Sequence, residues 1–598
     1  MRGRAIQLPP FKQSPPRSPG TTNMFQQADA RRRPVVIAWT AAVIMTLVFA
    51  GLIGRVWQLQ ARPQTSITQL AGSQSSIASL FGRRGTIYSR DGRALAVTKV
   101  VKRLFVDPML IDDPNTFSER LGYGLGYDPA HVEQVISRRF DSRYVVIDPW
   151  LSHERDARLR AMPRLPGLAT QRRLARLYPH GNLAGQVLGV VGVDRRGLEG
   201  LELTLNSQLS PAGGRIAYLR DARRRPLWAT DNQHQPPRDG QDVRLSIDVT
   251  IQHIAEQQLA VTCQRYKASH GNMIAINPRT GEILAMANYP PFDPNKLAGS
   301  NADLRRNRCV TDVFEPGSTF KPFVWAAATQ AGVVHLDEMI DCTTSGAYRL
   351  PFGRVLHDAH ANGLQTWDGV LIKSSNIGMG QVGMRLGPRR MHDAVRRFGF
   401  GVVAGNELPG EAVGIVHPVR RWSKYTITSV PMGQEIAVTA MQLTRAFCVF
   451  ANGGVLLRPT IFAVDGDAAG ERVIGGQTAD VTRYVLRRVV SEGTGRRANS
   501  KMYDLFGKTG TAQVPDRVHG GYEADQYVAS FLAGAPYDRP RIVIGCFIHR
   551  PDKQIGYYGG IVAAPPVKQV VEQVLPYLGV TPNDPHDDDP RPVQLVSH

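Results

Sequence analysis

Residues 314–323 read FEPGSTFKPF, and this stretch determines how the rest of the chain is interpreted. The Pro-Gly pair interrupts the chain, and the alanine-rich residues 324–331 that follow predict a helix that begins at about Ser318. Ser318 and Lys321 are three residues apart, so they would share one face of that helix. An amine within reach of a serine hydroxyl can take its proton and activate it as a nucleophile. Alone, this S-x-x-K pattern is more often a capping serine beside a solvated lysine.

Two further motifs strengthen the nucleophile hypothesis. Residues 371–377 read LIKSSNI and contain S-x-N between two helical stretches, whereas residues 505–514 read LFGKTGTAQV and predict a strand that carries K-T-G. Two apolar strands follow at 527–533 and 541–548, as in an antiparallel meander. Each motif is weak alone. The order S-x-x-K, S-x-N, K-T-G, with starting residues 56 and 134 apart, is a strong signal for one serine-based site.

The N-terminal region contains one membrane-span candidate. Residues 35–54 read VVIAWTAAVIMTLVFAGLIG without a charge, and twenty helical residues match the ~30 Å hydrocarbon core of a bilayer. The run is too long for the apolar core of a signal peptide, and no small-residue cleavage site follows it. Arg31, Arg32 and Arg33 precede it, so the positive-inside rule predicts a cytoplasmic basic tail at 1–34 and an extracytoplasmic remainder.

The residue pattern of the remaining chain changes near residue 240. Residues 60–240 mix short apolar runs with Arg, Gly and Pro, contain no catalytic constellation and predict an irregular, strand-containing module. Residues 245–580 form the second predicted domain, with a helix at 250–259 and a hairpin over 272–287. Residues 581–598 are rich in Pro and Asp without apolar periodicity, which predicts a disordered tail. We predict an α+β fold.

Composition limits the classes of partner. The 598 residues include 72 Lys and Arg and 51 Asp and Glu, which gives a net charge of +21. A charge of this size is compatible with binding to nucleic acid, anionic lipid or an anionic wall polymer. No run interleaves basic with aromatic residues as a nucleic-acid platform does, and the predicted topology disfavours such a partner. The five cysteines are scattered, with no C-x-x-C pair and no His at zinc-finger spacing. We therefore expect no metal site and no cofactor.

The three motifs in this order resemble those of the class B penicillin-binding proteins, which are membrane-anchored D,D-transpeptidases that cross-link peptidoglycan. The resemblance covers residues 31–580. Residues 306–308 and 311–318 are similar to the septal branch, commonly called penicillin-binding protein 3, and S-x-N rather than S-x-D favours that branch over the elongation branch. It implies a catalytic domain made of a helical subdomain and an antiparallel sheet flanked by helices.

The upstream module resembles the pedestal of the same family. Arg84-Gly85-Thr86-Ile87 and the glycine- and glutamate-containing residues 197–202 carry this resemblance. Two positions depart from it. Ser89 stands where an Asp is common, and Gln186 stands where a His is common.

The resemblance also implies a role for each motif residue. The implied catalytic set is Ser318, Lys321, Ser374 and Lys508, and the implied substrate-binding set is Asn376, Thr509, Gly510 and Thr511. Ser318 would attack the penultimate D-Ala carbonyl of a stem pentapeptide, with Lys321 as general base and the backbone N–H groups of Ser318 and Thr511 as the oxyanion hole. Burial and the charge of Lys508 would both lower the pKa of Lys321.

The implied partners are stem peptides, β-lactams, the cytoplasmic membrane and a separate SEDS-type glycan polymerase with other division proteins. A separate polymerase is needed because residues 60–240 lack the acidic motif of a glycosyltransferase. Three other functions remain open: an elongation-type class B transpeptidase, a β-lactamase, and a non-enzymatic acylatable sensor or division scaffold.

Overall fold

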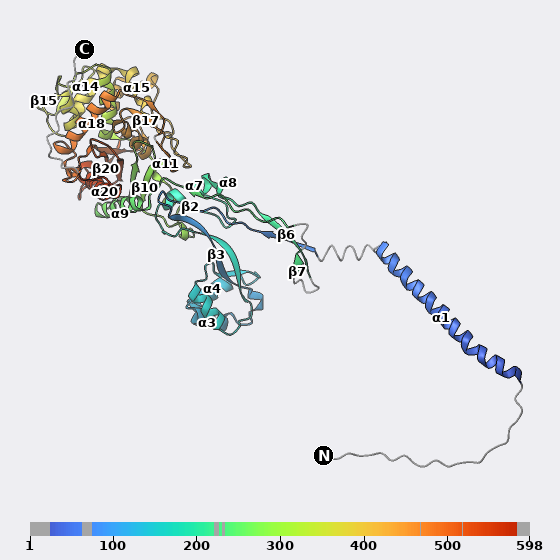
Figure 1. Cartoon of the computed structure of the whole chain (residues 1–598). Coiled ribbons are helices and arrows are strands. Elements are labelled where there is room, and N and C mark those ends of the chain that lie inside the picture. The colour runs from blue at the N-terminus through green and yellow to red at the C-terminus, as the bar shows by residue number, and fades with distance from the viewer. Residues whose placement is uncertain are drawn as a thin grey trace. The chain divides into compact units, whose positions relative to one another are not determined.

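The computed structural model of the protein describes residues 24–61, 75–220, 226–229, 234–466, 468–516 and 518–582 (Figure 1). The chain divides into two compact units: Met1–Leu80 with Gly214–Pro236, and Phe81–Gly213 with Pro237–His598. Most of the predicted basic tail and nearly all of the predicted C-terminal tail fall outside the described residues.

The first unit contains the N-terminal helix and a small sheet. Helix α1 spans Met24–Ala61, and its 27-residue segment Val35–Ala61, with a hydropathy of 2.4, is long and apolar enough to cross a membrane. It continues past the predicted end at Gly54 because residues 55–61 contain no Pro or Gly. Strands β1 (Ser75–Leu80), β6 (Gly214–Arg220) and β7 (Pro226–Ala229) form an antiparallel sheet in the order β1-β6-β7.

The pedestal portion of the second unit is strand-containing, as predicted. Its sheet runs β4-β3-β2-β8, with β5 paired to β3. These strands are β2 (Ile87–Tyr88), β3 (Ala94–Val106), β4 (Val145–Asp148), β5 (Leu168–Leu177) and β8 (Val243–Arg244). The helices are α3 (Pro114–Leu125), α4 (Pro129–Ser137), α5 (His153–Ala161), α6 (Gly185–Leu188), α7 (Gly200–Thr204) and α8 (Asn206–Leu209). Asp113 and Asp128 cap α3 and α4, each followed by a proline, so these starts are encoded locally.

A buried ion cluster explains why the two pedestal motifs occur together. Glu202 is fully buried, and its two carboxylate oxygens accept from Arg84 Nε and Arg176 Nε at 2.6 Å each. Arg84 comes from the first motif and Glu202 from the second. Gln186 makes its own contacts in place of the expected histidine, because its Nε2 donates to the carbonyl oxygens of Pro290 and Leu304 at 2.9 and 3.1 Å.

The three motifs are organised by a five-stranded antiparallel sheet in the order β10-β9-β21-β20-β19. Its strands are β9 (His270–Ile276), β10 (Ile283–Tyr289), β19 (Phe506–Pro515), β20 (Tyr522–Ala535) and β21 (Ile542–His549). Alternate residues enter two cores, one shared with α9 (Val249–Arg265) and α20 (Ala564–Tyr577) and the other with α17 (Ala440–Phe447). Helices therefore cover both faces of the sheet.

A helical subdomain completes the second unit. Its main helices are α12 (Lys321–Gln330), α13 (Trp367–Lys373), α14 (Asn376–Leu386), α15 (Pro388–Arg397), α16 (Lys424–Ser429) and α18 (Gly476–Ser491). Short strands pair as β11 (Val313–Phe314) with β16 (Val438–Thr439), β12 (Met339–Asp341) with β15 (Leu364–Thr366), β13 (Ala347–Arg349) with β14 (Val355–His357), and β17 (Val455–Leu457) with β18 (Gly470–Arg472). An aromatic core holds the nucleophile motif, because Phe320 and Phe323 pack on Phe400 with ring centroids 4.9 and 5.1 Å apart.

The predicted α+β architecture, hairpin, K-T-G strand and meander are confirmed. One local prediction was wrong: the α-helix begins at Lys321, and Ser318 lies on a 3₁₀ turn over Gly317–Phe320. The cause is Pro322, which has no N–H to donate to the carbonyl of Ser318. That carbonyl instead accepts from the N–H of Lys321, which closes a tighter turn. The five cysteines are buried free thiols.

Candidate active site

The S-x-x-K and S-x-N motifs meet through the side chain of Lys321. Its Nζ donates to the Ser374 carbonyl oxygen at 2.6 Å, to Asn376 Oδ1 at 2.8 Å and to Ser374 Oγ at 3.2 Å. Ser374 ends α13 in the left-handed region with a φ of 60°, and α14 begins two residues later. This sharp turn between two helices directs both Ser374 and Asn376 at Lys321.

The K-T-G motif joins the same network from the sheet. Lys508 Nζ donates to Ser374 Oγ at 2.9 Å, so this hydroxyl accepts from two lysines. Strand β19 also lies directly against the turn that carries Ser318. A Cβ atom at Gly510 would lie 2.9 Å from Thr319 Cγ2 and 2.4 Å from Ser530 Oγ, so the close approach requires glycine at this position.

The two lysines are buried cations, and burial changes their pKa values. Both are 0% exposed. Burial lowers the pKa of Lys321 to about 7, partly opposed by the negative charge of Asp358. Burial, together with the charge of Lys321, lowers the pKa of Lys508 well below its usual range. Of the two predicted causes, burial therefore acts on Lys321, whereas the repulsion between the amines lowers the pKa of Lys508.

The hydroxyl of Ser318 is half-buried and makes no hydrogen bond with any residue in the described part of the chain. Lys321 is thus hydrogen-bonded to Ser374 and Asn376, and the Ser318 hydroxyl has no hydrogen-bond partner among the described residues. Among the described residues, no group of three or more His, Cys, Asp and Glu side chains could hold a metal ion.

Comparison with known proteins accounts for this combination of motifs and folds. A family model of the penicillin binding protein transpeptidase domain matches residues 271–572, and one of the penicillin-binding protein dimerisation domain matches residues 80–245. The chain is 32% identical over 550 residues to PenA of Neisseria meningitidis, a probable peptidoglycan D,D-transpeptidase, which covers 90% of this chain and 92% of that protein. The chain belongs to the class B penicillin-binding proteins. This is a family of peptidoglycan D,D-transpeptidases.

Two further relatives support the same assignment. The peptidoglycan D,D-transpeptidase FtsI of Escherichia coli is 30% identical over 563 residues, which cover 92% of this chain and 93% of that one. Penicillin-binding protein 3 of Mycobacterium tuberculosis, solved in complex with aztreonam, aligns with a TM-score of 0.65 at 28% identity and covers 85% of this chain and 99% of that structure. The penicillin-binding protein 3-like character predicted from the sequence is confirmed.

One polar residue of this penicillin-binding protein was missed by the sequence reasoning. The Asp358 carboxylate accepts from the N–H groups of Asn376 and Ile377 at 2.5 and 3.0 Å and from Ser375 Oγ at 2.6 Å. It therefore fixes the start of α14, where the helix dipole favours negative charge. Asp358 lies 18 residues before Asn376 in an irregular segment, and no local pattern marks it.

The substrate-binding candidates of this penicillin-binding protein are already held by neighbouring groups. Thr509 Oγ1 and Thr494 Oγ1 lie 2.6 Å apart, and Thr511 Oγ1 accepts from the N–H of Gly559 at 3.0 Å. Asn376 Nδ2 donates to the carbonyl oxygen of His357 at 2.8 Å. These bonds orient the three side chains.

Proposed function

We propose that this class B penicillin-binding protein cross-links peptidoglycan at the division septum through an acyl-enzyme on Ser318. The observation that carries the proposal is the pair of buried amines that converge on Ser374 Oγ beside the turn that holds Ser318. The proposed parts are the catalytic region at residues 245–580 and a supporting pedestal at residues 60–240. FtsI and PenA, both named as peptidoglycan D,D-transpeptidases, support the reaction class.

In the proposed acylation step, neutral Lys321 takes the proton of Ser318 Oγ as this atom attacks the carbonyl of the penultimate D-Ala. The backbone N–H groups of Ser318 and Thr511 stabilise the oxyanion. The C–N bond then breaks, and the departing D-Ala nitrogen takes a proton from Ser374 Oγ. The oxygen of this hydroxyl accepts from Lys508, so its own hydrogen is free to be donated, and a proton from Lys508 replaces it. An acceptor amine finally attacks the ester carbonyl and gives up a proton through Ser374 to Lys508. The ester C–O bond breaks, and Lys321 returns its proton to Ser318 Oγ.

The test of this function is labelling of the full-length protein in membranes by a fluorescent penicillin. We expect a long-lived adduct on the wild-type chain and none on the Ser318→Ala variant. Rapid release of hydrolysed penicillin would instead support a β-lactamase. Labelling without any release of D-Ala from a pentapeptide substrate would support an acylatable sensor. Depletion in the host cell separates the two branches: loss of a septal enzyme should block division while growth continues, and loss of an elongation enzyme should block growth in length while division continues.

The proposed location is the cytoplasmic membrane, with a cytoplasmic N-terminus and an extracytoplasmic catalytic region. Arg31, Arg32 and Arg33, which directly precede the apolar segment Val35–Ala61 of α1, support this orientation by the positive-inside rule. We further propose that a SEDS-type glycan polymerase and other division proteins act with the chain and that β-lactams acylate it. A reporter enzyme active only in the cytoplasm, fused after His598, is expected to be inactive. Reporter activity there would contradict the orientation.

Acylation should depend on pH through the base. Lys321 acts only when neutral, so the acylation rate is expected to rise with pH and to level off above a midpoint of about 7. In Asp358→Asn the midpoint should move to lower pH, because the charge that raises the pKa of Lys321 is removed. The measurement is the second-order rate of penicillin labelling from pH 5 to 9. A flat profile, or a shift of the variant to higher pH, would rule out Lys321 as the titrating base.

Thr511 is proposed to bind the carboxylate shared by D-Ala-D-Ala and β-lactams. Thr511→Val should slow acylation by a carboxylate-bearing substrate about ten- to hundred-fold, the usual scale for one hydrogen bond to a charged group. For an ester substrate without that carboxylate, the acylation rate should fall much less. Comparable losses for both substrates would mean that Thr511 acts through the oxyanion hole or through folding.

A further inference from the structure

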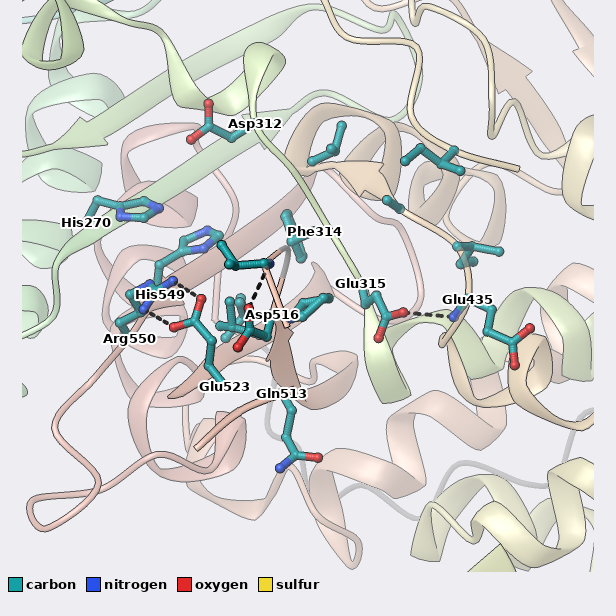
Figure 2. Close-up of a pocket in the computed structure, with 18 of the residues that line it drawn as sticks. His270, Asp312, Phe314, Glu315, Glu435, Gln513, Asp516, Glu523, His549 and Arg550 are labelled. Atoms are coloured by element: carbon teal, nitrogen blue, oxygen red, sulfur yellow. Dashed lines mark hydrogen bonds and ion pairs between the residues drawn. The ribbon is translucent and has the colours of Figure 1, made fainter. Parts of the chain in front are cut away.

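A cavity adjoins the S-x-x-K and K-T-G motifs. It has a volume of about 830 Å³ and is lined by residues that flank β11, by the end of β19 and by the end of β21 (Figure 2). Glu315, three residues before Ser318, forms one end, together with Glu435. His549 and Arg550 lie at the other end of the view.

The end nearest Ser318 carries two carboxylates, Glu315 and Glu435, that form no ion pair within the described part of the chain. Among the described residues, the Glu315 carboxylate accepts only from neutral donors, the N–H of Glu435 at 2.9 Å and the hydroxyl of Tyr522 at 2.9 Å, and burial raises its pKa. Glu435 is exposed, and none of the ion pairs in the described part of the chain involves its carboxylate. At the other end, Glu523 is neutralised by two bonds to Arg550 at 2.5 and 2.6 Å. The guanidinium of Arg354 interacts with the charge of Glu435 through space, but its hydrogen bonds within the described residues go to Tyr425, Thr428 and Ser429, so it forms no ion pair with Glu315 or Glu435.

The far end supplies an independent sign of a ligand. His549 is 6% exposed, and its Nε2 is buried without a hydrogen-bond partner among the described residues. Its ring is held by stacking on His270 at 4.2 Å and by edge contact with Phe314 at 5.2 Å between centroids. A buried ring nitrogen without a partner costs free energy that a bound polar group would recover.

Much of the cavity lining is apolar and includes Phe314, Ile436, Val514 and Val528. The polar side chains of Gln513 and Asp516 also line it, between the two ends in the view of Figure 2. A ligand that fits this cavity has a cationic group for Glu315 and Glu435, an aliphatic stem, and a polar group for His549. Those are the features of a peptide residue with an amine on an aliphatic side chain.

We propose that this cavity is a subsite for the ammonium-bearing side chain of a stem peptide. The proposal concerns binding only and rests on the proposed function, because the cavity matters through its position beside Ser318. The same chemistry can come from the donor stem, before acylation, or from the acceptor stem, which must approach the acyl-enzyme. In either case Glu315 and Glu435 would hold the amine close to Ser318, because Glu315 precedes Ser318 by three residues.

The experiment uses the full-length protein and compares Glu315→Gln and Glu435→Gln with Glu471→Gln, which removes an exposed carboxylate from β18 outside the cavity. In the donor arm, the probe is a pentapeptide with a free side-chain amine, measured against the same peptide acetylated at that amine. In the acceptor arm, Ser318 is acylated by a thioester that has no ammonium, and transfer to an amine-bearing tripeptide is measured against hydrolysis.

Selectivity is the rate ratio of free to acetylated pentapeptide in the donor arm, and of transfer to hydrolysis in the acceptor arm. We expect Glu315→Gln and Glu435→Gln to lower this ratio about tenfold in one of the two arms. The arm that changes identifies the stem that supplies the amine. The wild-type selectivity should also weaken at high salt, since the carboxylates are not fully buried. His549→Phe keeps a ring on His270 and removes Nε2, and it should lower selectivity in the same arm. Because Glu435 is exposed, its variant should fold even if Glu315→Gln does not.

Unchanged selectivity in both arms for Glu435→Gln, with Ser318 still acylated by benzylpenicillin, would overturn the subsite. A wild-type chain that benzylpenicillin does not acylate would instead refute the proposed function. Benzylpenicillin carries no ammonium, so its reaction separates the two failures.

Discussion

Lys321→Arg is expected to slow acylation of Ser318 by ~10²–10⁴-fold, the usual contribution of a general base. The guanidinium stays protonated at every working pH and has no lone pair for the serine proton. Lysine can serve because burial brings its pKa to about 7, so a large fraction is neutral at physiological pH. The measurement is the time course of fluorescent penicillin labelling, with thermal unfolding as the check on folding.

The size of the arginine side chain requires a second variant. Lys321 is 0% exposed, and the larger guanidinium could disturb its packing. Lys321→Met is neutral and of similar length, and it should show the same loss. Lys373→Arg is the matched control, because this exposed lysine directly precedes Ser374. Acylation at wild-type rates in both Lys321 variants would mean that another group, such as Lys508, activates Ser318.

The sequence predicted the elements whose signals are local. The strands that became β19, β20 and β21 are apolar runs separated by turn residues, and α9 follows Asp248, which caps its first N–H groups. The motif order then predicted which elements meet. The structure brings Lys321, Ser374, Asn376 and Lys508 into one hydrogen-bonded network.

What the sequence did not predict depends on contacts between distant segments. Asp358 has no local pattern, because its partners are the backbone groups of a helix that starts 18 residues later. The cavity at Glu315 is assembled from segments as far apart as His270 and Arg550, so no motif marks it. The 3₁₀ turn at Ser318 could have been predicted from the sequence. Pro322 has no N–H, so it cannot donate the α-helical hydrogen bond to the carbonyl of Ser318.

The pedestal contains a buried carboxylate that pairs with two buried arginines. The side chains of Glu202, Arg84 and Arg176 are 0%, 4% and 5% exposed, so solvent screens their charges weakly. A buried cation that loses its partner is strongly destabilising, because neither water nor another anion compensates it. Since Glu202 lies in a helix and the two arginines come from other segments, the cluster ties three parts of the pedestal together.

Glu202→Gln is therefore expected to destabilise the pedestal by about 3–5 kcal/mol, although the side chain keeps its shape. Glu199→Gln is the matched control three residues earlier, where the pair with Arg305 at 2.9 Å is partly exposed and should contribute under about 1 kcal/mol. Urea-dependent proteolysis of the full chain in detergent, followed at cleavage sites within residues 81–213, measures the pedestal, and penicillin labelling of Ser318 reports the catalytic region separately. Equal losses for the two variants would show that Glu202 acts as an ordinary surface charge, and loss of labelling at the same urea concentration as pedestal cleavage would show that the two regions unfold together.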